Sequence, residues 1–119
     1  MMGFDEEAFY LARTPLNVEV RTTTGYWDYL ITMKHPVMKG KEDFVKAALQ
    51  FQDEIRQSKT DKDVFLYYKR FDKLYCVVIK QIGMEGFLIT AYPTDKVKKE
   101  GGVLLTELNY SEVEWRYQS

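Results

Sequence analysis

The stretch that decides the fold runs from Val64 to Ile82 and reads Val-Phe-Leu-Tyr-Tyr-Lys-Arg, Phe-Asp-Lys, Leu-Tyr-Cys-Val-Val-Ile-Lys-Gln-Ile. Its two outer parts are rich in β-branched and aromatic residues, which favour strands. The short polar break at Asp72-Lys73 is typical of a turn. The pattern therefore predicts a β-hairpin with strands at 64–70 and 74–82.

Weaker strand patterns lie on both sides of this hairpin. Residues 16–21 alternate between apolar and polar side chains, residues 54–58 form a short candidate strand, and residues 87–92 form another that ends before Pro93. Residues 103–108 and 112–117 are expected to be short extra strands or a tail. Residues 1–15 are expected to be an acidic amphipathic start followed by a turn at Thr14-Pro15.

Two segments have helical spacing. Thr24 is the expected cap of a helix over about 25–34, with Trp27, Leu30 and Ile31 on one face. A second helix is expected over 42–52, where acidic residues occupy the first turn and Phe44, Val45, Ala48 and Leu49 share a face. We therefore expect an α+β fold, with two N-terminal helices packed on one face of an antiparallel sheet of about four strands.

Length and composition fit one domain over residues 1–119. The net charge of −1 argues weakly against a large phosphate-binding surface, because such surfaces are usually basic. The only cysteine, Cys76, lies in an apolar run and is expected to be a small buried hydrophobe. No apolar run reaches the length of a membrane span and the amino terminus does not resemble a signal peptide, so a cytoplasmic location is expected.

His35, the only histidine, is expected at the end of the first helix, directly before Pro36. Histidine has an unperturbed pKa near neutral pH and is therefore a natural general acid or base. At a helix C-terminus the helix dipole is expected to favour its charged form. A simple helix-capping role explains the same position equally well.

Strand alternation divides the side chains of the predicted sheet into two faces. The more apolar face is expected to meet the helices: Phe65, Tyr67, Tyr75, Val77, Ile79, Phe87, Ile89 and Ala91. The open face is then expected to carry Arg56, Ser58, Tyr68, Lys80, Thr90 and Tyr92. Cations, hydroxyls and a histidine would suit cleavage of an RNA phosphodiester, because RNA carries an internal 2′-hydroxyl nucleophile. A solvated polar sheet face explains the same residues without chemistry.

Six short motifs occur in a fixed order: His35-Pro36, then residues 44–49, 53–58, 63–68, 76–80 and 88–92. Their order and spacing resemble a bacterial family of uncharacterised small domains, which is similar to the barnase–EndoU–colicin–RelE superfamily of toxin-type RNases. The resemblance covers about residues 24–101. It implies a metal-independent endoribonuclease that needs no cofactor, acts on RNA and has a cognate antitoxin as a possible partner.

The resemblance also implies roles for individual residues. His35 would act as acid or base, while Arg56 and Lys80 would hold phosphate. Ser58 would help to bind the substrate, and the hydroxyls of Tyr68, Thr90 and Tyr92 would position groups or carry protons.

Two alternatives use the same residues differently. The chain has nine tyrosines and a nearly balanced charge, and tyrosine is enriched in protein interfaces. A catalytically inert protein-binding module could therefore use the tyrosine-rich sheet face or a sheet edge. A purely structural protein is the third possibility.

Overall fold

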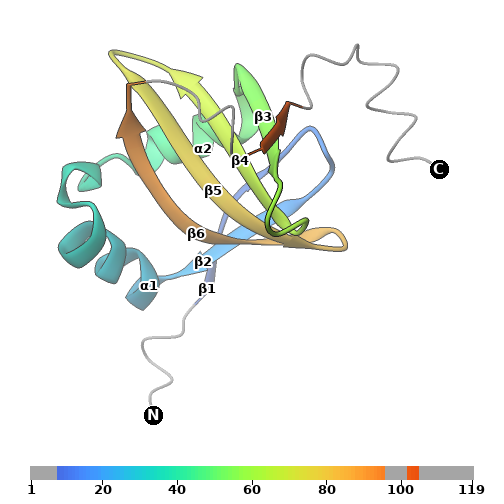
Figure 1. Ribbon diagram of the computed structural model, residues 1–119. Helices are drawn as coiled ribbons and strands as arrows, with labels where there is room; N and C mark the ends of the chain where they lie inside the picture. Colours follow the sequence, from blue (N-terminus) through green and yellow to red (C-terminus); the bar gives the residue numbers. More distant parts are fainter. Residues whose placement is uncertain (1–7, 96–101, 105–119) are drawn as a thin grey trace.

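The computed structural model describes residues 8–95 and 102–104. They form an α+β fold with one seven-stranded sheet in the order β1-β2-β6-β5-β4-β3-β7 (Figure 1). The strands are β1 (Ala8–Arg13), β2 (Glu19–Thr23), β3 (Glu54–Ser58), β4 (Val64–Arg70), β5 (Leu74–Ile82), β6 (Glu85–Thr94) and β7 (Gly102–Leu104), and the α-helices are α1 (Thr24–Tyr29) and α2 (Glu42–Phe51).

The predicted architecture, two N-terminal helices on an antiparallel sheet of about four strands, is wrong. A hairpin of β1 and β2 precedes the helices, and β2 pairs with β6 in parallel, so the sheet is both larger and mixed. The segment expected to be an acidic start and a turn contains β1, because Phe9 and Leu11 turn towards the core. The pairing of β2 with β6 joins residues far apart in the sequence, which local patterns do not report.

The predicted positions of the individual strands in the middle of the sheet are confirmed. The structure places β3, β4 and β5 at the expected residues, and β6 extends the expected strand at both ends. Of the two segments expected to be extra strands or a tail, the first overlaps β7 and otherwise lies outside the described residues, as does 112–117.

Both helices are found, but the first is shorter and less regular than expected. Its cap is Thr23, whose Oγ1 accepts a hydrogen bond from the backbone of Tyr26 at 3.0 Å, instead of Thr24. After Tyr29 the backbone widens into a π-helical turn over Leu30–Lys34, and a 3₁₀ turn follows over Pro36–Met38. Wide turns of this kind are frequent at functional sites.

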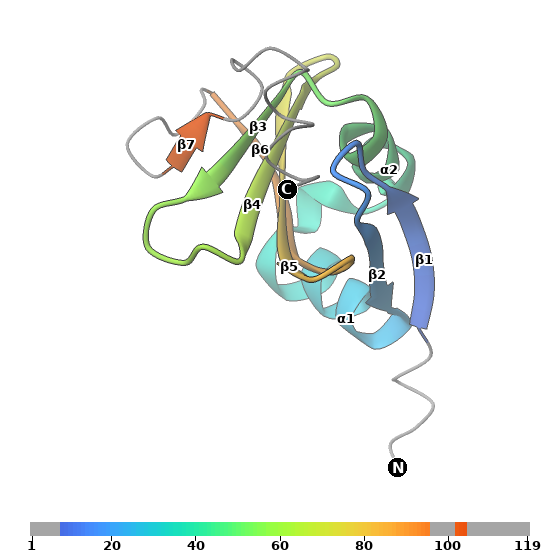
Figure 2. The same cartoon turned by 90° about the vertical axis from the view of Figure 1, so that its right-hand side faces the viewer.

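The main core lies between the sheet and the helices. Val45, Ala48 and Leu49 of α2 are fully buried there, together with Trp27 and Leu30 from the first helical segment. The sheet bends around the helices, and α2 contacts β1, β4 and β5 (Figure 2). Among the residues expected to face the helices, the structure buries Phe65, Tyr67, Tyr75, Val77, Ile79 and Ala91 in this core. No helix in the described part of the chain is long and apolar enough to cross a membrane.

A β-bulge changes which side chains of β6 face the helices. Val78 pairs with Thr90, but Ile79 pairs with Leu88, so Ile89 is the extra residue. The bulge brings Leu88 into the core, whereas Phe87 lies opposite Lys80 and is 47% exposed. The expectation that Phe87 faces the helices is therefore wrong, because a single inserted residue reverses the alternation.

Candidate functional site

Four of the residues predicted for the open face lie on adjacent strands. Tyr68 of β4 pairs with Cys76 of β5, which pairs with Tyr92 of β6. In the next row on the same face, Arg56 pairs with Leu66, Leu66 with Val78, and Val78 with Thr90. Tyr68, Thr90 and Tyr92 therefore occupy one region of the sheet, away from the helices, and Arg56 lies on the same face three strands from β6, about 14 Å away.

His35 joins this group from a different element. Its backbone N–H donates to the carbonyl of Leu30 at 2.7 Å, which closes the π-helical turn. Its imidazole lies against the ring of Tyr92, with the two ring centroids 5.3 Å apart and the planes inclined by 32°. The only histidine of the chain and a tyrosine of the sheet are thus direct neighbours.

The helical segment is held along the edge of β6, which explains how His35 reaches the sheet. Tyr26 donates a hydrogen bond through its hydroxyl to the carbonyl of Ile89, and the Nζ of Lys34 lies 3.4 Å from the same oxygen. That carbonyl is available because β2 pairs with β6 only as far as Phe87. Two side chains of the helical segment thus replace a neighbouring strand at this edge.

The protonation states of the two rings complement each other. Burial and the neighbouring charge of Lys34 lower the pKa of His35, so the net effect of its surroundings disfavours the charged imidazole, opposite to the direction expected from the helix dipole. Burial, and then the neighbouring Cys76 and Tyr68, raise the pKa of Tyr92 far above its usual range. A neutral imidazole therefore faces a protonated phenol at neutral pH.

Arg56 and Tyr68 lie deeper than was expected for a solvated face. The Arg56 side chain is 8% exposed and its Nε lies 2.7 Å from Oε2 of Glu54. Tyr68 is fully buried in a second cluster with Cys76 and Leu74. The Thr90 Oγ1 is buried and has no hydrogen-bond partner among the residues that the structure describes.

Lys80 and Ser58 lie elsewhere on the sheet. Lys80 is four residues from Cys76, about 13 Å along β5, and forms an ion pair with Asp61 at 3.5 Å. The Ser58 hydroxyl lies 3.1 Å from that of Thr60. The structure thus separates these two predicted substrate-binding residues from the group around Tyr92.

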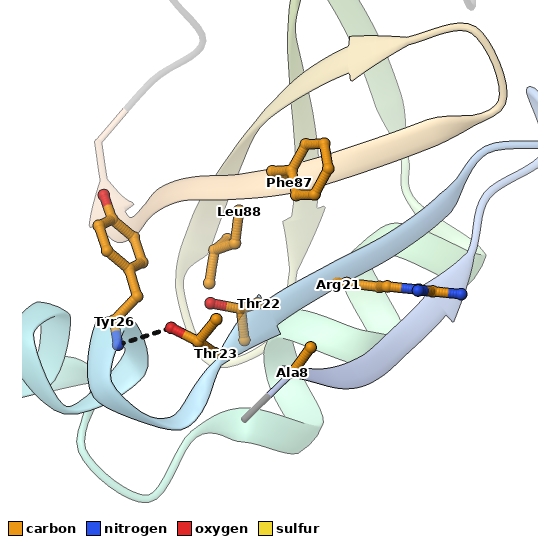
Figure 3. A pocket seen from close by; sticks show the side chains of 7 residues that line it. All are labelled: Ala8, Arg21, Thr22, Thr23, Tyr26, Phe87 and Leu88. Carbon is orange, nitrogen blue, oxygen red and sulfur yellow. Dashed lines mark hydrogen bonds between the residues drawn. The ribbon is translucent and has the colours of Figure 1, made fainter. Parts of the chain in front are cut away.

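Sequence reasoning missed a pocket between β2 and β6. The two strands pair over Glu19–Arg21 and Glu85–Phe87 and then separate, leaving a cavity of about 340 Å³ (Figure 3). The cavity is lined by Ala8, Arg21, Thr22, Thr23, Tyr26, Phe87 and Leu88. No local sequence signal marks this pocket, and the nearby Gly86 instead allows close packing, because a Cβ there would lie 2.9 Å from both Ile79 and Val18.

In the part of the chain that is described, no group of three or more histidine, cysteine, aspartate or glutamate side chains is placed to hold a metal ion. Comparison of the chain with protein-family models, with curated proteins and with solved structures finds no match.

Proposed function

We propose that the protein is a metal-independent endoribonuclease in which His35 and Tyr92 form the acid–base pair. The contact between their rings is the observation that carries the proposal, because it joins the chain's only histidine to the predicted sheet site. The motif resemblance to toxin-type RNases implies roles for the same two residues.

The lowered pKa of His35 and the raised pKa of Tyr92 assign the two proton transfers. Neutral His35 accepts the proton of an RNA 2′-hydroxyl, and the 2′-oxygen attacks the adjacent phosphorus. The bond from phosphorus to the 5′-oxygen breaks, and this leaving oxygen takes the proton of Tyr92. The products are a 2′,3′-cyclic phosphate and a 5′-hydroxyl end.

The surrounding residues fit supporting roles. Lys34 brings a cation next to His35, where it would attract the phosphate and also keep the imidazole neutral. Thr90 lies two residues from Tyr92 on β6, and its buried hydroxyl would position neighbouring groups. Tyr68, which influences Tyr92, would act as a positioning residue, and Arg56, held by Glu54 three strands from β6, would meet the substrate chain farther along the same face.

The proposed substrate is RNA. The proposed partner is a cognate antitoxin protein, and the proposed location is the cytoplasm. Single-stranded RNA suits the proposed chemistry, because its backbone can adopt the in-line arrangement that attack requires. Cys76, the single cysteine of the chain, is buried, which suits a reducing compartment.

Cleavage of end-labelled RNA in the presence of a chelator tests the proposal. Wild type should produce cyclic-phosphate ends, and His35→Ala should reduce the rate by about 10²- to 10⁴-fold. Val37→Ala, which changes an exposed neighbour of His35, should cleave like wild type. Absence of cleavage by folded wild-type protein, or equal cleavage by His35→Ala, contradicts the proposal.

A protein-binding module is the second candidate, favoured by exposed apolar side chains at one end of the sheet. Tyr10, Ile82, Met84 and Phe87 are all about half exposed or more. Exposed apolar patches often mark interaction surfaces. A folded protein without nuclease activity that captures a partner through these residues would favour this function.

A further inference from the structure

Aromatic and basic side chains alternate across four neighbouring strands at the end of the sheet away from Tyr92. Tyr10 of β1 pairs with Arg21 of β2, which pairs with Phe87 of β6, which pairs with Lys80 of β5. Directly paired residues point to the same face of a sheet, so the four side chains form one row. We call this row the aromatic–basic row. Both of its rings are about half exposed.

The pocket between β2 and β6 opens beside Phe87 in this row. Thr22 lines the pocket and is 6% exposed, and its Oγ1 has no hydrogen-bond partner in the described part of the chain. Figure 3 shows this hydroxyl turned towards Leu88 and Tyr26, into the space between the strands. A buried, unpaired hydroxyl is costly unless a ligand or water completes its hydrogen bonding. The pocket thus offers apolar walls, an aromatic ring and one polar group for orientation, as small-molecule sites do.

The charges around the pocket favour an anionic ligand. Arg13 and Arg21 share one carboxylate, that of Glu19, at 3.6 and 2.6 Å, which leaves one positive charge on this trio. The Arg21 side chain is 48% exposed, so its remaining donors face solvent beside Phe87. Lys80 pairs with Phe87 from β5, and its ammonium group also forms the ion pair with Asp61 at 3.5 Å, so the five charged side chains together keep one net positive charge. A ring between two cations matches a nucleotide, whose base stacks while its phosphates meet the cations.

We propose that the aromatic–basic row and its pocket bind an unpaired nucleotide of single-stranded RNA. In this subsite the base stacks on Phe87 and reaches the Thr22 hydroxyl with its polar edge, while Arg21 and Lys80 contact the flanking phosphates. The inference rests on the proposed nuclease function and extends it, because Phe87 and Tyr92 lie on the same strand, opposite Lys80 and Cys76 and therefore about 13 Å apart. The RNA strand would then follow β6 from the subsite to the acid–base pair.

Binding of a non-cleavable RNA tests the subsite separately from catalysis. The probe is a fluorescein-labelled, fully 2′-O-methylated oligoribonucleotide, which lacks the 2′-hydroxyl nucleophile, and fluorescence anisotropy gives its Kd. Phe87→Ala should weaken binding about tenfold, because base stacking on an aromatic ring contributes at this level. Thr22→Val, which keeps the side-chain shape and removes the hydroxyl, should weaken binding about threefold to tenfold.

Phe51→Ala is the matched control, since Phe51 is a 67% exposed phenylalanine at the end of α2 and does not line the pocket. It should bind the probe like wild type. Thermal unfolding followed by circular dichroism establishes that each variant is folded. An unchanged Kd in Phe87→Ala, or an equal loss in Phe51→Ala, overturns the subsite, as does a wild type that binds no probe.

The subsite and the proposed function fail in different ways. If wild type binds the probe through Phe87 but does not cleave unmodified RNA, the subsite stands and the nuclease function fails. If wild type cleaves RNA and Phe87→Ala cleaves it equally well at limiting RNA concentration, the nuclease function stands and the subsite is overturned.

Discussion

The two ends of β6 lie in contrasting surroundings. At the end that carries Tyr92, the rings of His35 and Tyr92 are in contact and the neighbouring Tyr68 and Cys76 are fully buried. At the other end, Phe87 is half exposed between two cations and beside a cavity. The Tyr92 end suits proton transfer, because burial there shifts the pKa values of the side chains. The Phe87 end suits binding of a flexible RNA strand, because its side chains are accessible.

The difference arises from how each end of the strand is covered. The helical segment covers the edge of β6 near Tyr92, where Tyr26 and Lys34 meet the Ile89 carbonyl. Parallel pairing with β2 covers the other end, but only as far as Phe87. The bulge at Ile89 separates the two ends and turns Phe87 outwards. The strand β6 thus carries a partly buried side chain, Tyr92, at one end and an accessible side chain, Phe87, at the other.

The largest expected effect tests the buried end. Tyr92→Phe removes the proposed proton donor and should reduce RNA cleavage by about 10²-fold or more, while binding of the 2′-O-methyl probe should stay unchanged. Tyr75→Phe removes a hydroxyl on the helix face that bonds Asp72, and it should cleave like wild type. Single-turnover cleavage rates check both variants, and full activity in Tyr92→Phe would remove this residue from the mechanism.

The β2–β6 pairing at the exposed end of β6 can be broken at Gly86. In Gly86→Ala the new Cβ meets Ile79 and Val18 at 2.9 Å, so the β2–β6 pairing must shift, at a cost of about 1–3 kcal/mol in unfolding free energy. Urea unfolding measures the loss. Val18→Ala should relieve part of the clash, so the costs of the double variant should not add. If the losses of unfolding free energy in the two single variants add up in the double variant, the new Cβ does not clash with Val18.

A smaller effect is expected where the helical segment meets β6. Tyr26→Phe removes the hydrogen bond to the Ile89 carbonyl and should cost about 0.5–1.5 kcal/mol. Tyr29→Phe changes a neighbouring tyrosine that is 49% exposed and should cost close to nothing. Thermal unfolding compares them. Equal stability of both variants would show that this contact does not hold the segment in place.

The smallest effect concerns the charge beside His35. Lys34→Gln removes the repulsion and should raise the pKa of His35 part of the way to 6.5, because burial is the larger cause of the lowering. A lowered folded-state pKa means that folding favours the neutral imidazole, so this contribution to stability is present at neutral pH and is lost on acidification. An NMR titration of the imidazole in both proteins checks the shift. A pKa that does not rise would exclude Lys34 as a cause.

The sequence predicted the elements whose signals are local. The hairpin of β4 and β5 was found because strand-forming residues flank a short turn, and α2 because its apolar residues keep helical spacing. The β1 strand and the parallel pairing of β2 with β6 were missed, since they depend on contacts between distant residues. Phe87 was assigned to the wrong face because a bulge has no clear sequence signal.

The candidate site was predicted in part. Alternation correctly placed Arg56, Tyr68, Thr90 and Tyr92 on one face, because β3, β4 and β5 run without a register shift between them and the two β6 residues both follow the bulge at Ile89. The burial of Arg56 and Tyr68 was not foreseen, since alternation gives the face of a side chain and not its exposure. The meeting of His35 with Tyr92 depends on the Tyr26–Ile89 contact, which joins two distant segments.

The pH dependence of RNA cleavage is the sharpest test of the proposed role of His35 as the base. Wild type and His35→Ala would be compared in single-turnover reactions with chelator, from acidic to neutral pH. The account predicts that the wild-type rate rises with pH through a pKa below the ordinary 6.5 of histidine and then levels off, because His35 must lose its proton to act as the base. His35→Ala should lack this rise. A wild-type rate without it, or the same profile in His35→Ala, would contradict the account.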